Sequence, residues 1–405
     1  MSYNLPVSFA PSSAYGVERQ PSGPRWALAG FLLSGFLLAL LGAILPVWGY
    51  HRDPPEFTVV GNYFLCLALG VAAAATPARR IMARRGVAFL LAFASGLACA
   101  ALLYLASLSP AASAWWRALG LLSLGLGAGL LNMALFHAIS RRYQSDAAGT
   151  VNMGGVWYGI GCLAATMLVG GTFYAYSVPV ILALMALAPG AFAVLYAKAS
   201  YPPGSAGTEP TLRQALADFR SPGAIMFALL LFFQFGNEWS LAGWLPLYLV
   251  RRVGLSPKAA VWMLALYWLF LLTGRLGSVA ILPRVRHGRL LLGSVVSAMF
   301  GCLILASTKT GFGAASGVLF VGAGYASMFP LVAEAIGRRF PYYHPGFFNG
   351  IFSLALMGGL LAPASLGYAA AAWGVGVVIG LPLLGTCMVM LLILLIWLES
   401  KVTGR

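Results

Sequence analysis

Charged residues are scarce in this chain of 405 residues: Asp, Glu, Lys and Arg together make up 8% of it, and only nine residues are acidic. Apolar residues make up 60%. A soluble domain of this size cannot cover its surface with so few charges, so the composition excludes a water-soluble globular protein. It predicts an all-α membrane protein whose helices cross the bilayer many times.

Reactive and metal-binding patterns are also missing. The five cysteines fall in five different apolar runs without a close-spaced pair, which disfavours disulfides and a thiolate metal site. The sequence contains no G-x-x-x-x-G-K-[ST] motif, which disfavours an ATP-driven pump, and no nucleophile–base pattern with enzyme spacing. We therefore expect no catalytic residue, no cofactor, no metal and no enzymatic activity.

Twelve apolar runs, separated by polar or Pro/Gly-containing joints, are long enough to cross a bilayer as helices. They span about 26–50, 57–76, 86–108, 115–138, 148–173, 176–197, 223–250, 257–282, 288–307, 311–337, 346–372 and 374–398. We expect a disordered cytoplasmic tail (1–25), a six-helix lobe (26–198), a cytoplasmic linker with a short amphipathic helix (199–222), a second six-helix lobe (223–398) and a short cytoplasmic tail (399–405).

The basic residues predict the orientation. With both termini inside, eighteen Lys and Arg fall in inner segments and six in outer ones, with Arg275 inside a span. The positive-inside rule favours this arrangement in a cell (inner) membrane. The net charge of +16 is then a topology signal, so we expect the lipid bilayer as a partner and no nucleic acid.

The two sets of six runs repeat one another. At an offset of 197, His137 falls on Glu334, Asn152 on Asn349, Gly161 on Gly358 and Gly170 on Gly367. At an offset of 204, the second run aligns with the eighth, and the first and seventh runs share a proline near their outer ends. Two parallel halves of six helices are the pattern of one large class of secondary transporters.

One run carries polar residues at its centre. Gln234, Asn237 and Glu238 lie in the middle of residues 223–250, and an acid at the bilayer centre costs about 2.5–3.5 kcal/mol on insertion scales. Gln234, Glu238 and Tyr248 share one helix face, so we expect that face to line a polar interior. Glu238 either binds substrate or a proton, which we favour, or forms a structural hydrogen bond between helices.

The chain resembles the major facilitator superfamily over residues 25–400, and its C-terminal lobe resembles the sugar-type branch, especially the fucose–galactose–glucose:proton symporters. The residues that carry the resemblance are Glu238 to Tyr248, Gly274-Arg275, Met328 to Glu334, Arg338 to Pro341, and Gly358-Gly359 with Pro363 and Gly367. It implies twelve transmembrane helices in two parallel six-helix lobes, the major facilitator fold. It also implies a conformational lock between Arg275 and Glu334.

The chain departs from this family in its acids. The signature after the second span, Gly70 to Gly86, keeps its basic end but has no acid, and the first and fourth spans lack the acids typical of fucose-type symporters. Proton coupling would then fall to Glu238. The candidate substrate-binding residues are Gln234, Asn237, Glu238, Trp244, Tyr248, Tyr267 and Asn132, and the candidate gate residues are Arg275, Glu334, His137, Asn152 and Asn349.

The function that these patterns favour is a secondary transporter. We expect a monomer that moves a small polar solute, sugar-like in the first instance, by alternating access, with proton coupling as the energy source. The alternatives are an exporter of an amphiphilic or drug-like compound and a non-transporting membrane sensor.

Overall fold

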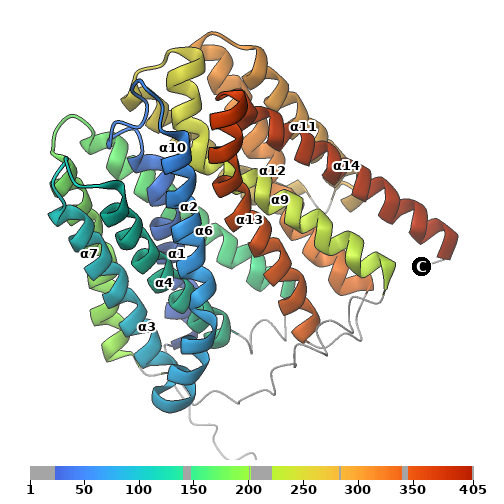
Figure 1. Ribbon diagram of the computed structural model, residues 1–405. Helices are drawn as coiled ribbons and strands as arrows, with labels where there is room; N and C mark the ends of the chain where they lie inside the picture. Colours follow the sequence, from blue (N-terminus) through green and yellow to red (C-terminus); the bar gives the residue numbers. More distant parts are fainter. Residues whose placement is uncertain are drawn as a thin grey trace, which may run out of the picture.

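The computed structural model describes residues 23–139, 147–199, 201, 221–281, 284–339 and 345–403. Within these ranges it contains twelve α-helices, one π-helix and no strand, which confirms the predicted all-α membrane fold (Figure 1). The helices are α1 (Gly23–Ile44), α2 (Phe57–Ala73), α3 (Ala75–Ser107), α4 (Ala114–Ala138), α6 (Ala147–Thr172), α7 (Val178–Lys198), α9 (Pro222–Tyr248), η1 (Leu249–Val253), α10 (Pro257–Ile281), α11 (His287–Ser307), α12 (Gly311–Arg339), α13 (Pro345–Trp373) and α14 (Val377–Thr403).

Several predicted features lie outside the described residues. They are most of the N-terminal tail, the amphipathic linker segment near 211–220 and the side chain of Asn349, whose backbone belongs to α13. By length and hydropathy, eleven described segments can cross a bilayer, with α2 and α3 forming one continuous segment. The chain is therefore a multi-pass membrane protein.

The helices form two groups, which we call the N half (α1 to α7) and the C half (α9 to α14). In the N half, α1 packs against α6, and α4 packs against α2 and α3. In the C half, α9 packs against α13, and α12 packs against α10 and α11. The halves meet mainly where α2 contacts α13 and where α6 contacts α10.

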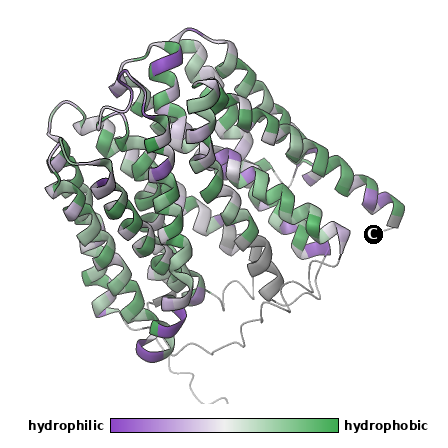
Figure 2. Cartoon of the chain, viewed as in Figure 1, coloured by the Kyte–Doolittle hydropathy of each residue, from purple (hydrophilic) through white to green (hydrophobic). Residues whose placement is uncertain are grey.

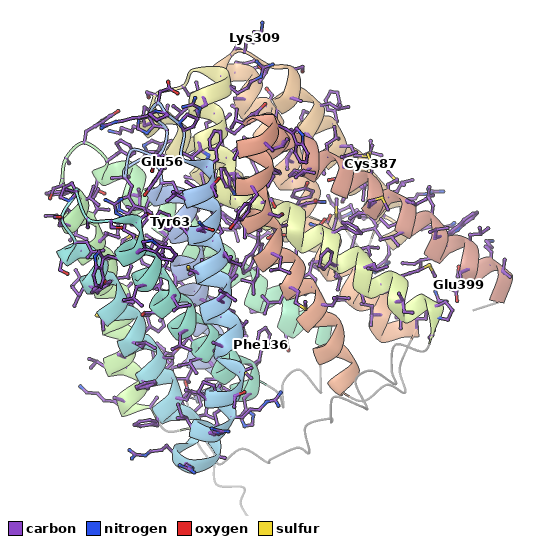
Figure 3. The ribbon with its side chains drawn as sticks, viewed as in Figure 1. Glu56, Tyr63, Phe136, Lys309, Cys387 and Glu399 are labelled. Atoms are coloured by element: carbon purple, nitrogen blue, oxygen red, sulfur yellow. The ribbon has the colours of Figure 1, made fainter. Side chains whose placement is uncertain are left out.

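The two ends of the bundle differ in charge. We call the end that carries the α2–α3 turn the basic face, because Arg79, Arg80, Arg84 and Arg85 are exposed there. The opposite face carries the loops 44–57, 107–114, 253–257 and 307–311. Figure 2 shows hydrophilic residues gathered at the α2–α3 turn, and Figure 3 places Lys309 at the tip of the opposite face. The halves diverge toward the basic face (Figure 1).

Proline and glycine set the helix limits. The helix α1 ends at Ile44, shortly before Pro46, and α9, α10 and α13 each begin at a proline, whose missing N–H needs no partner there. Within α3, Gly86 adopts φ 83°, a backbone conformation that side chains disfavour, and it separates the arginine-rich residues 75–85 from the span that follows. The predicted polar joint at 77–85 is thus helical itself.

Small residues let the helices approach closely, as is common where lipid surrounds them. A methyl group on Gly161 would lie 1.9 Å from the Leu32 carbonyl of α1, and one on Gly358 would lie 2.1 Å from the Phe232 carbonyl of α9. These two glycines are related by the offset of 197, and α1 and α9 are equivalent helices. The structure therefore gives both members of this predicted repeat the same contact.

Candidate functional site

A buried ion pair lies where the two halves meet. Arg275 of α10 places Nη2 3.4 Å from Oε1 of Glu238 on α9, and both residues are at most 5% exposed. The same guanidinium donates from Nη1 to the carbonyl oxygen of Gly155 on α6, at 2.8 Å. The pair belongs to the C half, and its contact with Gly155 reaches the N half.

Several polar atoms around this pair lack hydrogen-bond partners although they are buried. They are Oε2 of Glu238, Nε of Arg275, both amide atoms of Gln234 and Nε1 of Trp268. The Gln234 amide lies close enough to interact with the Glu238 carboxylate, but the two groups do not form a well-aligned hydrogen bond. Most buried polar groups in proteins are paired, because leaving one unsatisfied costs about 1–3 kcal/mol. This cluster holds unsatisfied donors and unsatisfied acceptors together, which is the arrangement that a hydroxyl-bearing or amide-bearing ligand satisfies.

A cavity of about 30 Å³ lies between the halves, and aromatic side chains line part of it. Tyr158 of α6 and Trp239 of α9 are nearly parallel, with an interplanar angle of 13° and ring centroids 6.5 Å apart. Trp268 meets Tyr158 edge-on at 6.4 Å. The other lining residues are Leu38, Ala39, Gly42, Phe64, Leu67, Ala242, Gly243, Gly359, Leu360 and Pro363.

Gln234 and Glu238, two of the predicted substrate residues, therefore lie in the polar cluster at the junction of the halves, although neither lines the cavity itself. Tyr267 lies beside them, since its hydroxyl donates to the backbone carbonyl of Glu238 at 3.3 Å. Trp244 contacts the N half: its ring stacks on Phe64, and its indole N–H donates to the Pro363 carbonyl at 2.8 Å.

Three other predicted substrate residues are engaged inside their own halves. Asn237 faces α14, with Nδ2 3.4 Å from Oγ1 of Thr386. The Tyr248 hydroxyl donates to the Leu305 carbonyl of α11 at 2.8 Å, and Asn132 accepts a hydrogen bond of 2.7 Å from Ser34 of α1. In this structure Tyr248 faces α11 and, like Glu238, does not line the cavity, so its role in substrate binding stays a prediction.

The predicted lock between Arg275 and Glu334 is not formed in this structure. Arg275 lies six residues before the end of α10 and Glu334 five residues before the end of α12, so their depths are similar, but the Arg275 side chain turns toward Glu238 on α9 and Gly155 on α6. Glu334 instead contacts Arg338 at 2.5 Å and His287 at 3.0 Å. These three residues join the start of α11 to α12 within the C half.

Two of the other predicted gate residues, His137 and Asn152, lie at the basic ends of helices of the N half. His137 lies in the last turn of α4. Asn152 lies near the start of α6, and its Oδ1 is buried without a partner. Asn349 is the one gate residue whose side chain the described part of the chain leaves out.

A contact that the sequence did not suggest closes the opposite face. Arg251 of η1 in the C half donates to the His51 carbonyl at 3.1 Å and to the Asp53 carboxylate at 2.8 Å, both in the α1–α2 loop of the N half. Its guanidinium also lies over the ring of Phe57, at 5.7 Å. Gly155 and Trp239 were missed as well, since a glycine in a packing pattern and a tryptophan beside Glu238 carry no distinct signal.

The fold described above is similar to those of known transporters. The chain superposes on solved structures of the nucleoside transporter NupG (14% identity, 93% of this chain and 98% of that chain, TM-score 0.67) and of a D-xylose–proton symporter (14%, 92% and 96%, 0.71). It also superposes on FucP in the outward conformation (16%, 92% and 98%, 0.64). At these identities the likeness concerns the fold.

No curated protein matches the chain. The family model described as Major Facilitator Superfamily matches residues 152–363, which is more than half of the sequence. This match and the fold define the class of the protein and exclude an enzyme. The chain is a member of the major facilitator superfamily, a secondary transporter that carries a small-molecule substrate across a membrane.

Proposed function

We propose that the protein transports a small, uncharged, hydroxyl-rich solute, most simply a sugar, and that Glu238 takes up the coupling proton. The observation that carries the proposal is the buried Glu238–Arg275 pair with its unsatisfied neighbours at the junction of the halves. The pair has no net charge while Glu238 is ionised, so it attracts neither a cation nor an anion strongly. A hydroxyl group both donates and accepts, and it satisfies Oε2 of Glu238 and the Gln234 amide together.

The aromatic pair supports the same class of solute. Tyr158 and Trp239 come from different halves and present nearly parallel rings at the cavity. A sugar ring has an apolar C–H face beside its hydroxyls, and an aromatic surface suits that face. One fold neighbour carries D-xylose and another carries nucleosides, which are both hydroxyl-rich solutes.

The coupling step follows from the chemistry of the pair. When Glu238 is ionised, Arg275 compensates its charge inside the protein. When Glu238 binds a proton, the carboxyl group becomes a donor as well as an acceptor, and its attraction for the guanidinium falls. Substrate hydroxyls then compete more easily for the site, so substrate and proton bind together. The halves rock around this midplane site to expose it to either side of the membrane.

The amphiphile exporter remains a second candidate, because most of the residues that line the cavity are apolar. A compound with a large apolar part would use this lining and would need few hydroxyl partners. Thermal stabilisation of the purified protein by sugars, nucleosides and amphiphilic cations separates the two. Stabilisation by amphiphiles alone would replace the sugar proposal.

Uptake into proteoliposomes tests the proposal. With an inward proton gradient, the parent protein accumulates labelled sugar above equilibrium, whereas Glu238→Gln exchanges sugar without accumulating it, because an amide cannot cycle a proton. Ser294→Ala is the matched control, since Ser294 is also polar and within a span but is bonded to Ser327 away from the site. Accumulation by Glu238→Gln at the parent rate would remove the coupling role from Glu238.

We also propose that the basic face is cytoplasmic, as the positive-inside rule requires, that both termini lie there in the cell membrane, and that a monomer suffices for transport. A cysteine placed at Ser2 should then resist a membrane-impermeant thiol reagent in intact cells and react after lysis. Labelling of this cysteine in intact cells would show that the N-terminus is outside and that the proposed orientation is wrong.

A further inference from the structure

We propose that the guanidinium of Arg275 links the charge of Glu238 to the contact between the two halves, through the backbone carbonyl of Gly155. The inference deepens the proposed function, on which it rests for the protonation of Glu238. It assigns a positioning role to Gly155, a residue with no side chain that does not line the cavity. The link consists of three groups on three helices: α9, α10 and α6.

The geometry makes the two partners of Arg275 compete. Nη2 lies 3.4 Å from the Glu238 carboxylate, and Nη1 lies 2.8 Å from the Gly155 carbonyl. Charge-assisted bonds between a guanidinium and a carboxylate are usually 2.7–2.9 Å long. The guanidinium thus holds the neutral carbonyl of the N half at full strength and the charged carboxylate of its own half only loosely.

The charge of Glu238 decides which partner prevails. An ionised carboxylate attracts the guanidinium, and a shift of about 0.5 Å would bring the pair into the charge-assisted range and lengthen the bond to Gly155. A protonated carboxyl attracts it less, and the guanidinium then stays on the Gly155 carbonyl. Protonation therefore strengthens the bond between the halves, and ionisation weakens it.

Among the titratable groups around the pair, Glu238 is the one whose change of charge can act on Arg275. The other titratable side chains close to it are Tyr158 and Cys162 on α6 and Tyr267 on α10. Tyrosine and cysteine are neutral near pH 7, because their ordinary pKa values are about 10 and 8.5. Glu238 is then the group near Arg275 whose charge changes when a proton is carried.

The position of the contact between Arg275 and Gly155 along the seam determines how strongly it affects the movement of the halves. Along the seam between α6 and α10, the halves touch at Gly170 and Trp262, at Gly159 and Leu272, and at Gly155 and Arg275, in order from the opposite face toward the basic face. Of these three contacts, the one made by Arg275 lies nearest the side where the halves diverge. A bond made or broken there changes how easily the halves rotate about the seam.

A substitution at Gly155 can disturb its contact with Arg275 without changing any charge. A methyl group at this position would lie 2.9 Å from Nη1 of Arg275, so Gly155→Ala pushes the guanidinium off the carbonyl without changing a charge. The neighbouring Gly154 is the matched control. A methyl group there would meet Phe31 of its own half at 3.6 Å, which is ordinary contact.

The test measures the distance between the halves at the opposite face. Spin labels on cysteines at Ala111 and Lys309, exposed loop positions of the N and C halves, report that distance in lipid nanodiscs once the five native cysteines are replaced. No substrate and no gradient are present. A failed uptake assay therefore leaves this result unaffected, and a failed distance test leaves sugar transport intact.

We expect Glu238→Gln to increase the population with the opposite face closed, as in this structure, by about tenfold, the effect of one hydrogen bond to a charged group. Gly155→Ala should decrease that population, and Glu238→Gln should then have no further effect in the Gly155→Ala background. Gly154→Ala should match the parent. Arg275→Lys, which keeps the charge but cannot reach both partners, should match Gly155→Ala.

The proposal is overturned if Glu238→Gln shifts the distances equally in the parent and Gly155→Ala backgrounds. It is overturned as well if Gly155→Ala behaves as Gly154→Ala does, or if Glu238→Gln shifts nothing. A thermal melt of each purified variant verifies that all of them are folded before the distances are compared.

Discussion

At equivalent positions of the two halves, the side chains differ in charge. The offset of 200 that relates Pro46 to Pro246 pairs Leu38 with Glu238, and the offset of 204 pairs Val71 with Arg275. In the N half, Leu38 packs against a small apolar cluster that contains Val71. In the C half, the same two positions hold a buried ion pair.

This difference between the halves indicates that the ion pair is not needed for the stability of the fold. The N half shows that these two positions can be filled with aliphatic side chains in the same fold. Buried ion pairs are often no more stabilising than well-packed apolar residues of similar size. The pair in the C half is therefore best explained by what it does during transport. In the proposed function, the coupling proton and the polar groups of the substrate would both be handled by the C half.

The largest effect is expected when one partner of the pair is removed. Arg275→Val should lower the free energy of unfolding by about 3–5 kcal/mol, because it leaves a buried carboxyl without its partner. The double variant Glu238→Leu with Arg275→Val, which copies the N half, should recover most of that loss and still fail to accumulate substrate. Thermal unfolding of both variants in the same detergent measures this. A double variant as unstable as the single one would mean that the C half cannot accept the apolar arrangement.

The aromatic residues provide the next test, because Tyr158 belongs to the N half and Trp239 to the C half. Trp239→Ala should weaken substrate binding by about tenfold, since stacking contributes about 0.5–1.5 kcal/mol beyond the buried area. Trp239→Phe should retain most of the affinity. Titration of the purified variants with substrate gives the values. Equal affinity for the parent and Trp239→Ala would place the substrate away from this ring.

The sequence predicts the order of the helices better than it predicts which way each helix faces. The succession of spans and the equivalence of Gly161 and Gly358 follow from hydropathy and from repetition, whereas the run predicted at 26–50 ends as a helix at Ile44 and the joint predicted at 77–85 is helical. The rotation of α9 does not follow, because a period of 3.6 gives the angle between Glu238 and Tyr248 but not the direction that either one faces. The helix is packed by α1, α10, α12, α13 and α14, so no bare face marks the other half.

The ion pair itself shows the same limit. The predicted spans hold two acids, Glu238 and Glu334, besides Arg275, and the family resemblance paired Arg275 with Glu334, which also lies toward the basic end of its helix. Which acid Arg275 meets depends on the depth of its side chain and on the rotation of α10, and neither leaves a trace in hydropathy. The contact with Gly155 is invisible for a further reason: its acceptor is a backbone carbonyl.

A smaller effect is expected at the polar contact within the N half. Ser34→Ala should lower the free energy of unfolding by about 1 kcal/mol, the usual net value of one hydrogen bond, because it removes the bond to Asn132. Its KM for the substrate should equal that of the parent. A raised KM would bring Asn132 into the substrate site and so weaken the contrast between the two halves.

The smallest effect concerns pH at the opposite face. Burial lowers the pKa of His51 below its ordinary value of 6.5, with help from the neighbouring Arg52. When the face opens and His51 is exposed, its pKa returns toward 6.5, so the open form binds a proton more readily. The closed form should therefore lose stability as the pH falls below about 6.5. The spin-label distances at pH 7.5 and 5.5 test this, and His51→Gln should remove the dependence that His51 adds.

Glycines at two contacts between the halves, α2 with α13 and α1 with α9, have a practical consequence. A methyl group on Gly367 would lie 2.4 Å from the Cα atom of Gly61, and one on Gly42 would lie 2.2 Å from the carbonyl oxygen of Ala242. The two halves thus touch backbone to backbone in this conformation, with no room for a single carbon atom between them. An alanine at Gly367 should therefore keep the two halves apart at the opposite face. Such a variant would provide a trapped form for studying the remaining steps of the transport cycle.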